Sequence, residues 1–263
     1  MRKAITPVIL TAVLIAAALF PGCTLTGAGD MITAQIPPIG DFTSVDITDT
    51  FEVEITPSDS FSVTIYADRD SYDYVTVSRQ GETLKIYLNL RNIFADFTLQ
   101  SRTLKAKITM PALYGLRLSG ASKGTVSGFK SSSDFSLDVS GASSLDMSDI
   151  EVGNAEFEVS GASKVTGDMK ANDVKFQVSG ASRVELEGTA NSTVLNASGA
   201  STVDLTYFPL KDADVTLANA SEATVDAKET LDMVVSGASR LYLLGNPTIG
   251  NMDISGASTV KHK

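Results

Sequence analysis

The sequence lacks most of the side chains on which metal centres, disulfide frameworks and nucleophilic active sites are built. Its 263 residues include no Trp, one Cys and one His. A cysteine-rich zinc site and a disulfide framework are therefore excluded. A serine nucleophile would lack a base, because His262 is the sole imidazole. Since the sequence also has no Walker loop and no dinucleotide-binding glycine motif, we expect neither a metal nor a cofactor.

Positive charge is scarce as well. The chain has 31 Asp and Glu against 21 Lys and Arg, which gives a net charge of −10 at pH 7. A surface of this sign repels a phosphate backbone, so nucleic acid is not an expected partner. With 43% hydrophobic and 20% charged residues, the composition is that of a globular protein. The length allows one large domain or two small ones.

The N-terminus has the layout of an export signal. Arg2 and Lys3 precede an apolar run from Val8 to Phe20. At about 13 residues this run is shorter than the ~20 residues that span a bilayer, so residues 1–23 are predicted to be a signal segment. The only cysteine, Cys23, follows the run where cleavage of a lipoprotein signal would leave it.

Cys23 is accordingly the predicted site of lipidation, through which the protein would be anchored to the membrane. The alternatives are an ordinary secretory signal with an incidental cysteine, or an uncleaved N-terminal anchor. Residues 24–40 are predicted to be a tether between this end and the folded domain. We therefore expect an exported protein, at the cell surface or on the periplasmic side.

An internal repeat dominates the rest of the chain. The tetrapeptide Ser-Gly-Ala-Ser, with one Ala-Asn-Ala-Ser variant, recurs eight times at intervals of 18 to 21 residues, beginning at Ser119, Ser140, Ser160, Ser179, Ser198, Ala218, Ser236 and Ser255. Apolar and polar residues alternate on both sides of each copy, as in Phe135, Leu137 and Val139 before the second. This period of two is typical of strands with one buried face.

Two short strands in each repeat cannot bury an apolar face alone and must stack on their neighbours. The period is too short for a propeller blade, and the Leu-x-x-Leu-x-Leu frame of leucine-rich repeats is absent. The sequence therefore predicts an all-β fold, a parallel β-helix solenoid of about eight coils. A third apolar position predicts a further short strand and a roughly triangular section, at Phe129, Ile150, Met169, Leu210 and Ile249.

Each tetrapeptide is predicted to form a structural corner. Its second position is occupied by glycine or asparagine, the residues that best adopt positive φ, at Gly120, Gly141, Gly161, Gly180, Gly199, Asn219, Gly237 and Gly256. The fourth-position serines are small enough to stack from coil to coil, and their hydroxyls can bond along the ladder. We interpret them as structural, because catalysis would need only one.

The region before the repeats has alternating runs but no tetrapeptide. We predict that residues 41–113 form an irregular N-terminal β cap and the first coils, and that residues 114–260 form the repeat coils. Together, residues 41–260 would be a single β-helix domain. Such a cap would cover the unpaired strands that a solenoid exposes at its end.

These features together resemble a known family. The chain resembles the putative auto-transporter adhesin head domain family, also called the head GIN domain. The resemblance rests on an export signal, a β-rich region that ends at Met110-Pro111-Ala112-Leu113, and serial Val-Ser-Gly-Ala-Ser coils. The resemblance covers about residues 41–260. It implies a right-handed parallel β-helix of exported and cell-surface proteins with a proposed role in adhesion, and it brings no catalytic residues.

Outward positions of successive coils form columns, and one column contains a pair of acids. Asp138 and Glu158 stand two residues before their tetrapeptides, so they are predicted to stack on adjacent coils about 5 Å apart. Paired carboxylates at such a distance can hydrolyse glycosidic bonds. Adjacent surface acids are also expected by frequency in a chain this acidic.

A second outward column carries most of the local positive charge. One residue after the tetrapeptides it contains four cations and a single acid, Glu222; the cations are Lys123, Lys164, Arg183 and Arg240. This stripe is a candidate binding site for an anionic surface polymer. The alternative is that the cations pair with the acidic column across the corner.

Three functions are compatible with these features. We favour a binding or structural module of the cell surface or envelope, an adhesin without catalytic activity that contacts an envelope polysaccharide or a surface protein at many points. The first alternative is a carbohydrate-active enzyme, a polysaccharide lyase or hydrolase that uses Asp138 and Glu158. The second is an envelope scaffold that binds only protein.

Overall fold

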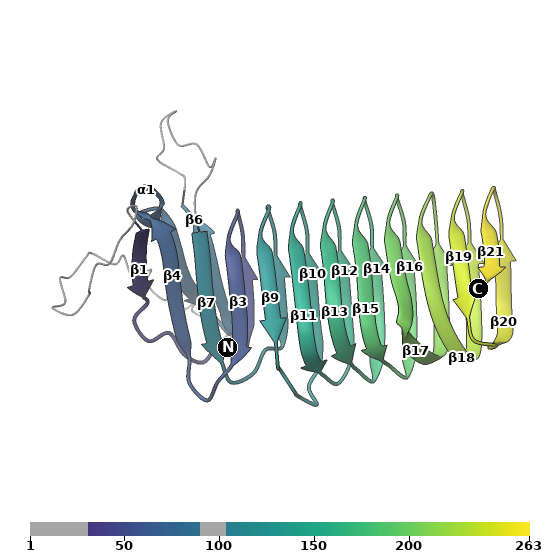
Figure 1. Cartoon of the computed structure of the whole chain (residues 1–263), viewed down its shortest axis with the longest axis horizontal. Helices are drawn as coiled ribbons and strands as arrows, with labels where there is room; N and C mark the ends of the chain where they lie inside the picture. The colour runs from purple at the N-terminus through teal and green to yellow at the C-terminus, as the bar shows by residue number, and fades with distance from the viewer. Residues whose placement is uncertain (1–30, 90–103) are drawn as a thin grey trace, which may run out of the picture.

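The computed structural model describes residues 31–89 and 104–263, which form one elongated stack of β coils (Figure 1). The parallel β-solenoid predicted from the repeat is confirmed, and its roughly seven turns are close to the eight expected. The predicted signal segment and Cys23 lie outside the described residues. Within the described ranges, no helix is long and apolar enough to cross a membrane.

Two parallel ladders of strands run along the stack and meet at the corners. The strands before the corners form the pre-corner ladder, in the spatial order β6 (Thr83–Leu88), β2 (Ser44–Ile47), β8 (Gly115–Leu118), β10 (Phe135–Val139), β12 (Ala155–Val159), β14 (Asp173–Val178), β16 (Ser192–Ala197), the second halves of β17 (Thr202–Leu217) and β18 (Glu222–Val235), and β20 (Thr248–Ile254).

The strands after the corners form the post-corner ladder. Its spatial order is β7 (Leu104–Met110), β3 (Glu52–Pro57), β9 (Lys123–Ser127), β11 (Ser144–Glu151), β13 (Lys164–Lys170), β15 (Arg183–Thr189), the first halves of β17 and β18, β19 (Arg240–Leu244) and β21 (Thr259–His262). Because both ladders are parallel, equivalent residues of successive repeats stand directly above one another.

The core consists of apolar columns that run the length of the stack. Alternation turns every second side chain inward, so β12 buries Ala155, Phe157 and Val159 and exposes the acids between them. Phe157 stacks on Phe176 of the next coil, with their ring centroids 5.2 Å apart. Each coil therefore buries its apolar face against its neighbours, and none can do so alone.

The third side of the coil continues the post-corner strand. Four of the five apolar residues predicted there are at most 5% exposed. The prediction is wrong for the fifth, Ile249, which lies in the pre-corner ladder in register with Leu231 and is 42% exposed. No separate short strand forms in the described coils: β11 passes a register shift between Met147 and Ile150 and runs on, and β17 and β18 extend through the bend. Asp149, with φ of 52°, makes the bend in β11.

Residues 44–57 form a regular coil without a tetrapeptide. Its strands β2 and β3 lie between the β6–β7 pair and the β8–β9 pair. Asp49 turns its corner with φ of 73°, and the amide of Ala121 donates to the Asp49 carbonyl at 2.6 Å. Residues 41–113, predicted to form an irregular cap and the first coils, thus contain one full member of the stack.

Antiparallel strands close the N-terminal end. β4 (Ser62–Asp68) pairs with β7, β1 (Met31–Gln35) pairs with β4, and β5 (Val75–Gln80) pairs with β6, while the short helix α1 (Arg69–Tyr72) packs beside β4 and β1 (Figure 1). Part of the predicted tether of residues 24–40 is a strand instead, because Met31–Gln35 satisfy their backbone groups on the edge of β4. At the other end, the domain extends past residue 260 through β21.

Candidate functional site

The corners are built on residues of positive φ. At the second position of the eight tetrapeptides φ lies between 66° and 79°. The amide of the following alanine donates to the corner carbonyl of the preceding coil, as in Ala181 to Gly161 at 2.7 Å. That carbonyl occupies the place where a Cβ would project from Gly180. Glycine is therefore favoured for space as well as for φ.

Asn219 shows what the corner can tolerate. It occupies the glycine position with φ of 66°. The hydrogen bond from Ala220 to the carbonyl of Gly199 beneath it is 2.9 Å long, compared with 2.7 Å from Ala200 to Gly180 one coil earlier. A Cβ is thus accommodated by a small widening of the stack at this corner.

The fourth-position serines are buried inside these corners. From Ser122 to Ser239, all seven are at most 2% exposed. Their hydroxyls reach the backbone of the same corner, as Ser201 Oγ donates to the Ser198 carbonyl at 2.8 Å. Residues 120–124 match the Gly-x-Ser-x-Gly pattern of a nucleophile elbow, but Ser122 is buried and donates to the Ser119 carbonyl at 3.0 Å. These serines hold the corner together.

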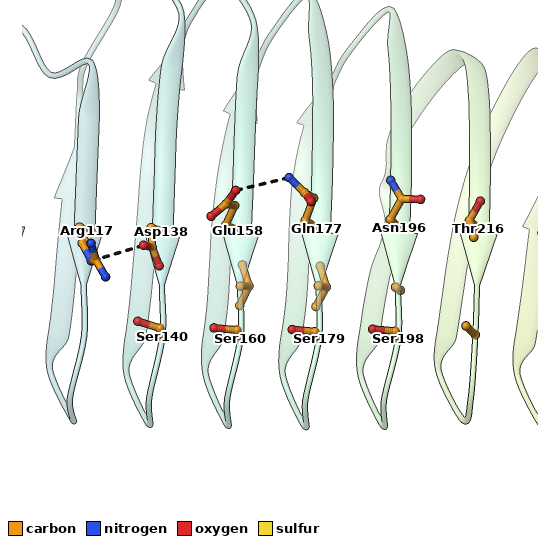
Figure 2. A pocket seen from close by; sticks show the side chains of 14 residues that line it. Arg117, Asp138, Ser140, Glu158, Ser160, Gln177, Ser179, Asn196, Ser198 and Thr216 are labelled. Atoms are coloured by element: carbon orange, nitrogen blue, oxygen red, sulfur yellow. Dashed lines mark hydrogen bonds and ion pairs between the residues drawn. The ribbon is translucent and has the colours of Figure 1, made fainter.

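A groove of about 540 Å³ runs along the outer surface of the pre-corner ladder, across β8 to β17 (Figure 2). One wall is the column that stands two residues before each tetrapeptide, with the register Arg117, Asp138, Glu158, Gln177, Asn196 and Thr216. A second row lies nearer the corners in Figure 2 and consists of the first-position serines Ser140, Ser160, Ser179 and Ser198.

The charged side chains of the groove are bonded to their neighbours. Arg117 Nε lies 3.3 Å from Asp138 Oδ2, which joins β8 to β10. Gln177 Nε2 donates to Glu158 Oε1 at 3.4 Å and to Glu156 Oε1 at 3.2 Å. The structure therefore brings Asp138 and Glu158 together as register partners on adjacent strands, and a neighbouring donor binds each carboxylate.

The other half of the groove is neutral and has free hydrogen-bonding groups. Asn196 and Thr216 follow Gln177 in the column, and within residues 31–89 and 104–263 their side chains have no hydrogen-bond partner. The same holds over these ranges for the hydroxyls of the four first-position serines. The groove thus changes along its length from ion-paired side chains to hydroxyl and amide groups that face solvent.

Sequence reasoning found the outer column of this groove but missed the serine row. The first-position serines recur with the corner, and their recurrence was assigned to the corner alone. A signal was present: they stand two residues after the outward column, so the period of two also turns them outward. They are half-buried in the structure, unlike the fourth-position serines.

The predicted cationic stripe lies on the post-corner ladder, around the corner from the groove. Arg183 Nε is 3.3 Å from Glu185 on its own strand, and Arg240 Nη1 is 3.8 Å from Glu222 one coil away. Lys123 and Lys164 lie in register with Ser144 between them. In the described part of the chain, none of these cations forms an ion pair across the corner with Asp138 or Glu158. Two of the four charges are balanced within the post-corner face.

Beside the groove, an exposed ion pair links two coils. Lys175 Nζ is 2.7 Å from Glu156 Oε1, and this hydrogen bond and charge, with help from Gln177, lower the pKa of Glu156. A carboxyl group whose pKa is lower in the folded state than in the unfolded state stabilises the fold at pH values above its unfolded-state pKa. The contribution is lost as the pH falls through the pKa of the folded state.

We expect Lys175→Met to return the pKa of Glu156 toward its ordinary value. The variant should be slightly less stable than the native chain at pH 7, by no more than about 0.5 kcal/mol because the pair is exposed. The difference should disappear once the pH is below the pKa of Glu156 in the folded native chain. Carboxyl NMR titration and urea unfolding at several pH values measure both effects, and a stability difference that grows in acid would contradict the assignment.

The described residues include no group of three His, Cys, Asp or Glu side chains arranged to hold a metal ion. The groove therefore offers hydrogen bonds and a few paired charges as its means of recognition. Its long, shallow form, with equivalent groups repeated on each coil, suits contact with an extended molecule more than enclosure of a small one.

Comparison with known families agrees with this architecture. Residues 41–247 match the family described as "Putative auto-transporter adhesin, head GIN domain". The chain belongs to this family. The match spans the N-terminal coils and all but the last coil of the head GIN domain, and it confirms the resemblance inferred from the repeated tetrapeptide. A comparison with curated proteins gives no match.

Solved structures share the fold of this head GIN domain at low sequence identity. A putative adhesin from Parabacteroides merdae has a TM-score of 0.79 and 15% identity, and a putative adhesin from Parabacteroides distasonis has 0.77 and 16%. A protein described as a putative lipid binding protein, also from Parabacteroides distasonis, has 0.76 and 18%. Each similarity covers 90% of this chain and 98% of the other.

Proposed function

We propose that this head GIN domain is an adhesin of the cell surface or envelope that binds an extended, hydroxyl-rich polymer, a polysaccharide, along the groove of the pre-corner ladder. The observation that carries the proposal is the set of hydroxyl and amide groups that have no hydrogen-bond partner among the described residues: the four first-position serines, Asn196 and Thr216. They repeat at the strand spacing of about 4.8 Å. Many weak contacts along one polymer add up to useful affinity.

Export and anchoring complete the proposal. The signal segment and the lipidated Cys23 expected from the sequence would hold the domain outside the cytoplasmic membrane. Adhesion at the surface agrees with the family to which the chain belongs. The polymer would then be a component of the cell's own envelope or of a neighbouring surface.

The groove is proposed to bind without cleaving. A glycosidase needs one carboxyl group of its pair to stay protonated and the other to stay ionised, and it separates them by placing them in different environments. Asp138 and Glu158 instead lie on the same open surface, and each accepts a bond from a neighbouring donor, Arg117 or Gln177. This arrangement favours a binding role for the two acids.

The proposal predicts that isosteric changes in the neutral half of the groove weaken binding to glycans. Asn196→Leu combined with Thr216→Val keeps the size of both side chains and removes their hydrogen bonds. On an array of neutral and acidic glycans, we expect roughly tenfold or greater loss of retention, since each lost bond leaves a polymer hydroxyl unpaired. Thr202→Val, on the post-corner ladder, is the matched control and should bind like the native chain.

Three results would contradict parts of this proposal. If Arg183→Glu loses binding to acidic glycans and the groove variant loses no binding, the site lies on the cationic stripe. Release of reducing ends that Asp138→Asn or Glu158→Gln abolishes would make the protein a carbohydrate-active enzyme. Retention of no glycan, together with specific capture of an envelope protein, would support a scaffold that binds only protein.

A further inference from the structure

The coil formed by β20 and β21 has the side-chain pattern of an inner coil. Three apolar side chains of β20 are 42–61% exposed, although their register partners on β18 are at most 1% exposed: Ile249, Met252 and Ile254 stand on Leu231, Met233 and Val235. Among the described residues, β20 pairs only with β18, and β21 pairs only with β19. No described residue therefore covers these core side chains or the outer edges of β20 and β21.

The two ends of the stack differ in this respect. At the N-terminal end, β1 and β4 continue the sheet in the antiparallel sense and α1 packs beside them (Figure 1). Solenoid proteins normally end in a repeat whose outer face is polar, because an apolar end with free backbone groups invites pairing with another chain. The last coil lacks such a polar face, and Ile254 remains apolar where a cap would carry a charge.

The last coil is also held in place by its own contacts, so that a strand of another molecule can pair with its edges. His262 Nε2 lies 2.6 Å from the Gly245 carbonyl, and Lys263 Nζ lies 4.4 Å above the ring of Tyr242. His262 belongs to β21 and is held in the ladder in register with Leu243. The exposed edges of β20 and β21 are ordered strands with fixed hydrogen-bonding directions.

Charge points to a second copy of this chain as the occupant. The whole chain has a net charge of −10, so most pairs of its surfaces repel each other. The last coil is different, because it carries Asp253 on β20 and two lysines, Lys261 and Lys263, at and beyond β21. Asp253 stands two residues before the tetrapeptide and Lys261 three residues after it, so both lie at a similar distance from the corner.

We propose that two copies join end to end through this coil, related by a two-fold axis. The axis runs along the strand direction through the corner, so that β20 of each copy pairs in the antiparallel sense with β21 of the other. Such an isologous contact covers both edges and both apolar faces at once. It also places Asp253 of each copy opposite Lys261 of its partner. A double-length rod with a groove in each half follows.

Sedimentation equilibrium of the full chain in a density-matched detergent tests this proposal. We expect a protein mass of twice 27.7 kDa at micromolar concentrations. Ile254→Lys should raise the dissociation constant of the dimer at least tenfold, because an unpaired charge then enters a desolvated contact. Val194→Lys is the matched control: Val194 is 42% exposed and lies on β16, away from the last coil, and its change should leave the dimer intact.

A charge exchange tests the register. Asp253→Lys should weaken the dimer, and adding Lys261→Asp to the same chain should restore it. A monomeric native chain would overturn the proposal. So would a dimer that Ile254→Lys leaves unchanged, since association would then run through the lipid anchor or another face. Unchanged circular dichroism in Ile254→Lys at 25 °C shows that the coil itself is still folded, and its thermal midpoint should lose the concentration dependence that a dimer gives the native chain.

Discussion

Gly180→Ala is expected to destabilise the protein by roughly 3 kcal/mol or more, although it adds a single methyl group at an exposed position. The residue has φ of 75°, which costs any residue with a Cβ about 1–2 kcal/mol. The new Cβ would also overlap the Gly161 carbonyl, which can retreat only by lengthening its 2.7 Å bond from Ala181, as the Gly199 carbonyl does beneath Asn219. Urea unfolding measures the loss.

Two other substitutions separate these causes. Gly81 has φ of 62° but open space around its missing Cβ, so Gly81→Ala should cost only the conformational part, about 1 kcal/mol. Gly180→Asn should be milder than Gly180→Ala, because Asn adopts positive φ more readily than Ala, and Asn219 does so at this position with a 2.9 Å bond beneath it. Gly180→Val should be at least as harmful as alanine. If Gly180→Ala and Gly81→Ala lower the free energy of unfolding equally, contact with the carbonyl of the preceding coil does not explain why glycine occupies the corner.

The second large effect is expected in the core. Phe157→Ala should lower the free energy of unfolding by about 3–5 kcal/mol, since Phe157 is fully buried and its removal leaves a cavity. The loss is shared by two coils, because the ring rests on Phe176 at 5.2 Å between centroids. Urea or guanidinium denaturation, followed by circular dichroism, measures the change.

Tyr207 supplies the control for this effect. It is also an aromatic residue on a strand of the stack, but it is 71% exposed. Tyr207→Ala should therefore change the stability by no more than about 0.5 kcal/mol. A comparable loss in both variants would mean that the strand propensity of the aromatic residue, and not burial of its ring, determines the stability.

Much of the architecture could be predicted because the same local pattern of corner and strand residues occurs eight times. The alternation around Phe157 and Phe176 indicated two-sided strands, and Gly180 and its equivalents indicated a left-handed corner. Stacking then followed, since no single coil can cover its own apolar face. The column of Asp138 and Glu158 was predicted by the same counting, and the structure places both in one groove.

The coil of residues 44–57 was not predictable from the tetrapeptide. Its corner has Asp49 in place of glycine. Its position in the stack also does not follow the chain order, because β6 and β7 come later in the sequence but lie nearer the N-terminal end of the stack. The strand β1 was missed for a related reason. Its pairing with β4 depends on an edge that exists only when the rest has folded.

By itself, the sequence determined which side chains point inward, where each coil turns and which residues share a column, because these depend on local periodicity and on φ. Tertiary structure alone decided which groups in a column bond to each other and which stay free. It assigned Arg117 to Asp138 and Gln177 to Glu158, and left Asn196 and Thr216 facing solvent. Such choices depend on distances between side chains of different coils, and those distances do not exist until the coils are stacked.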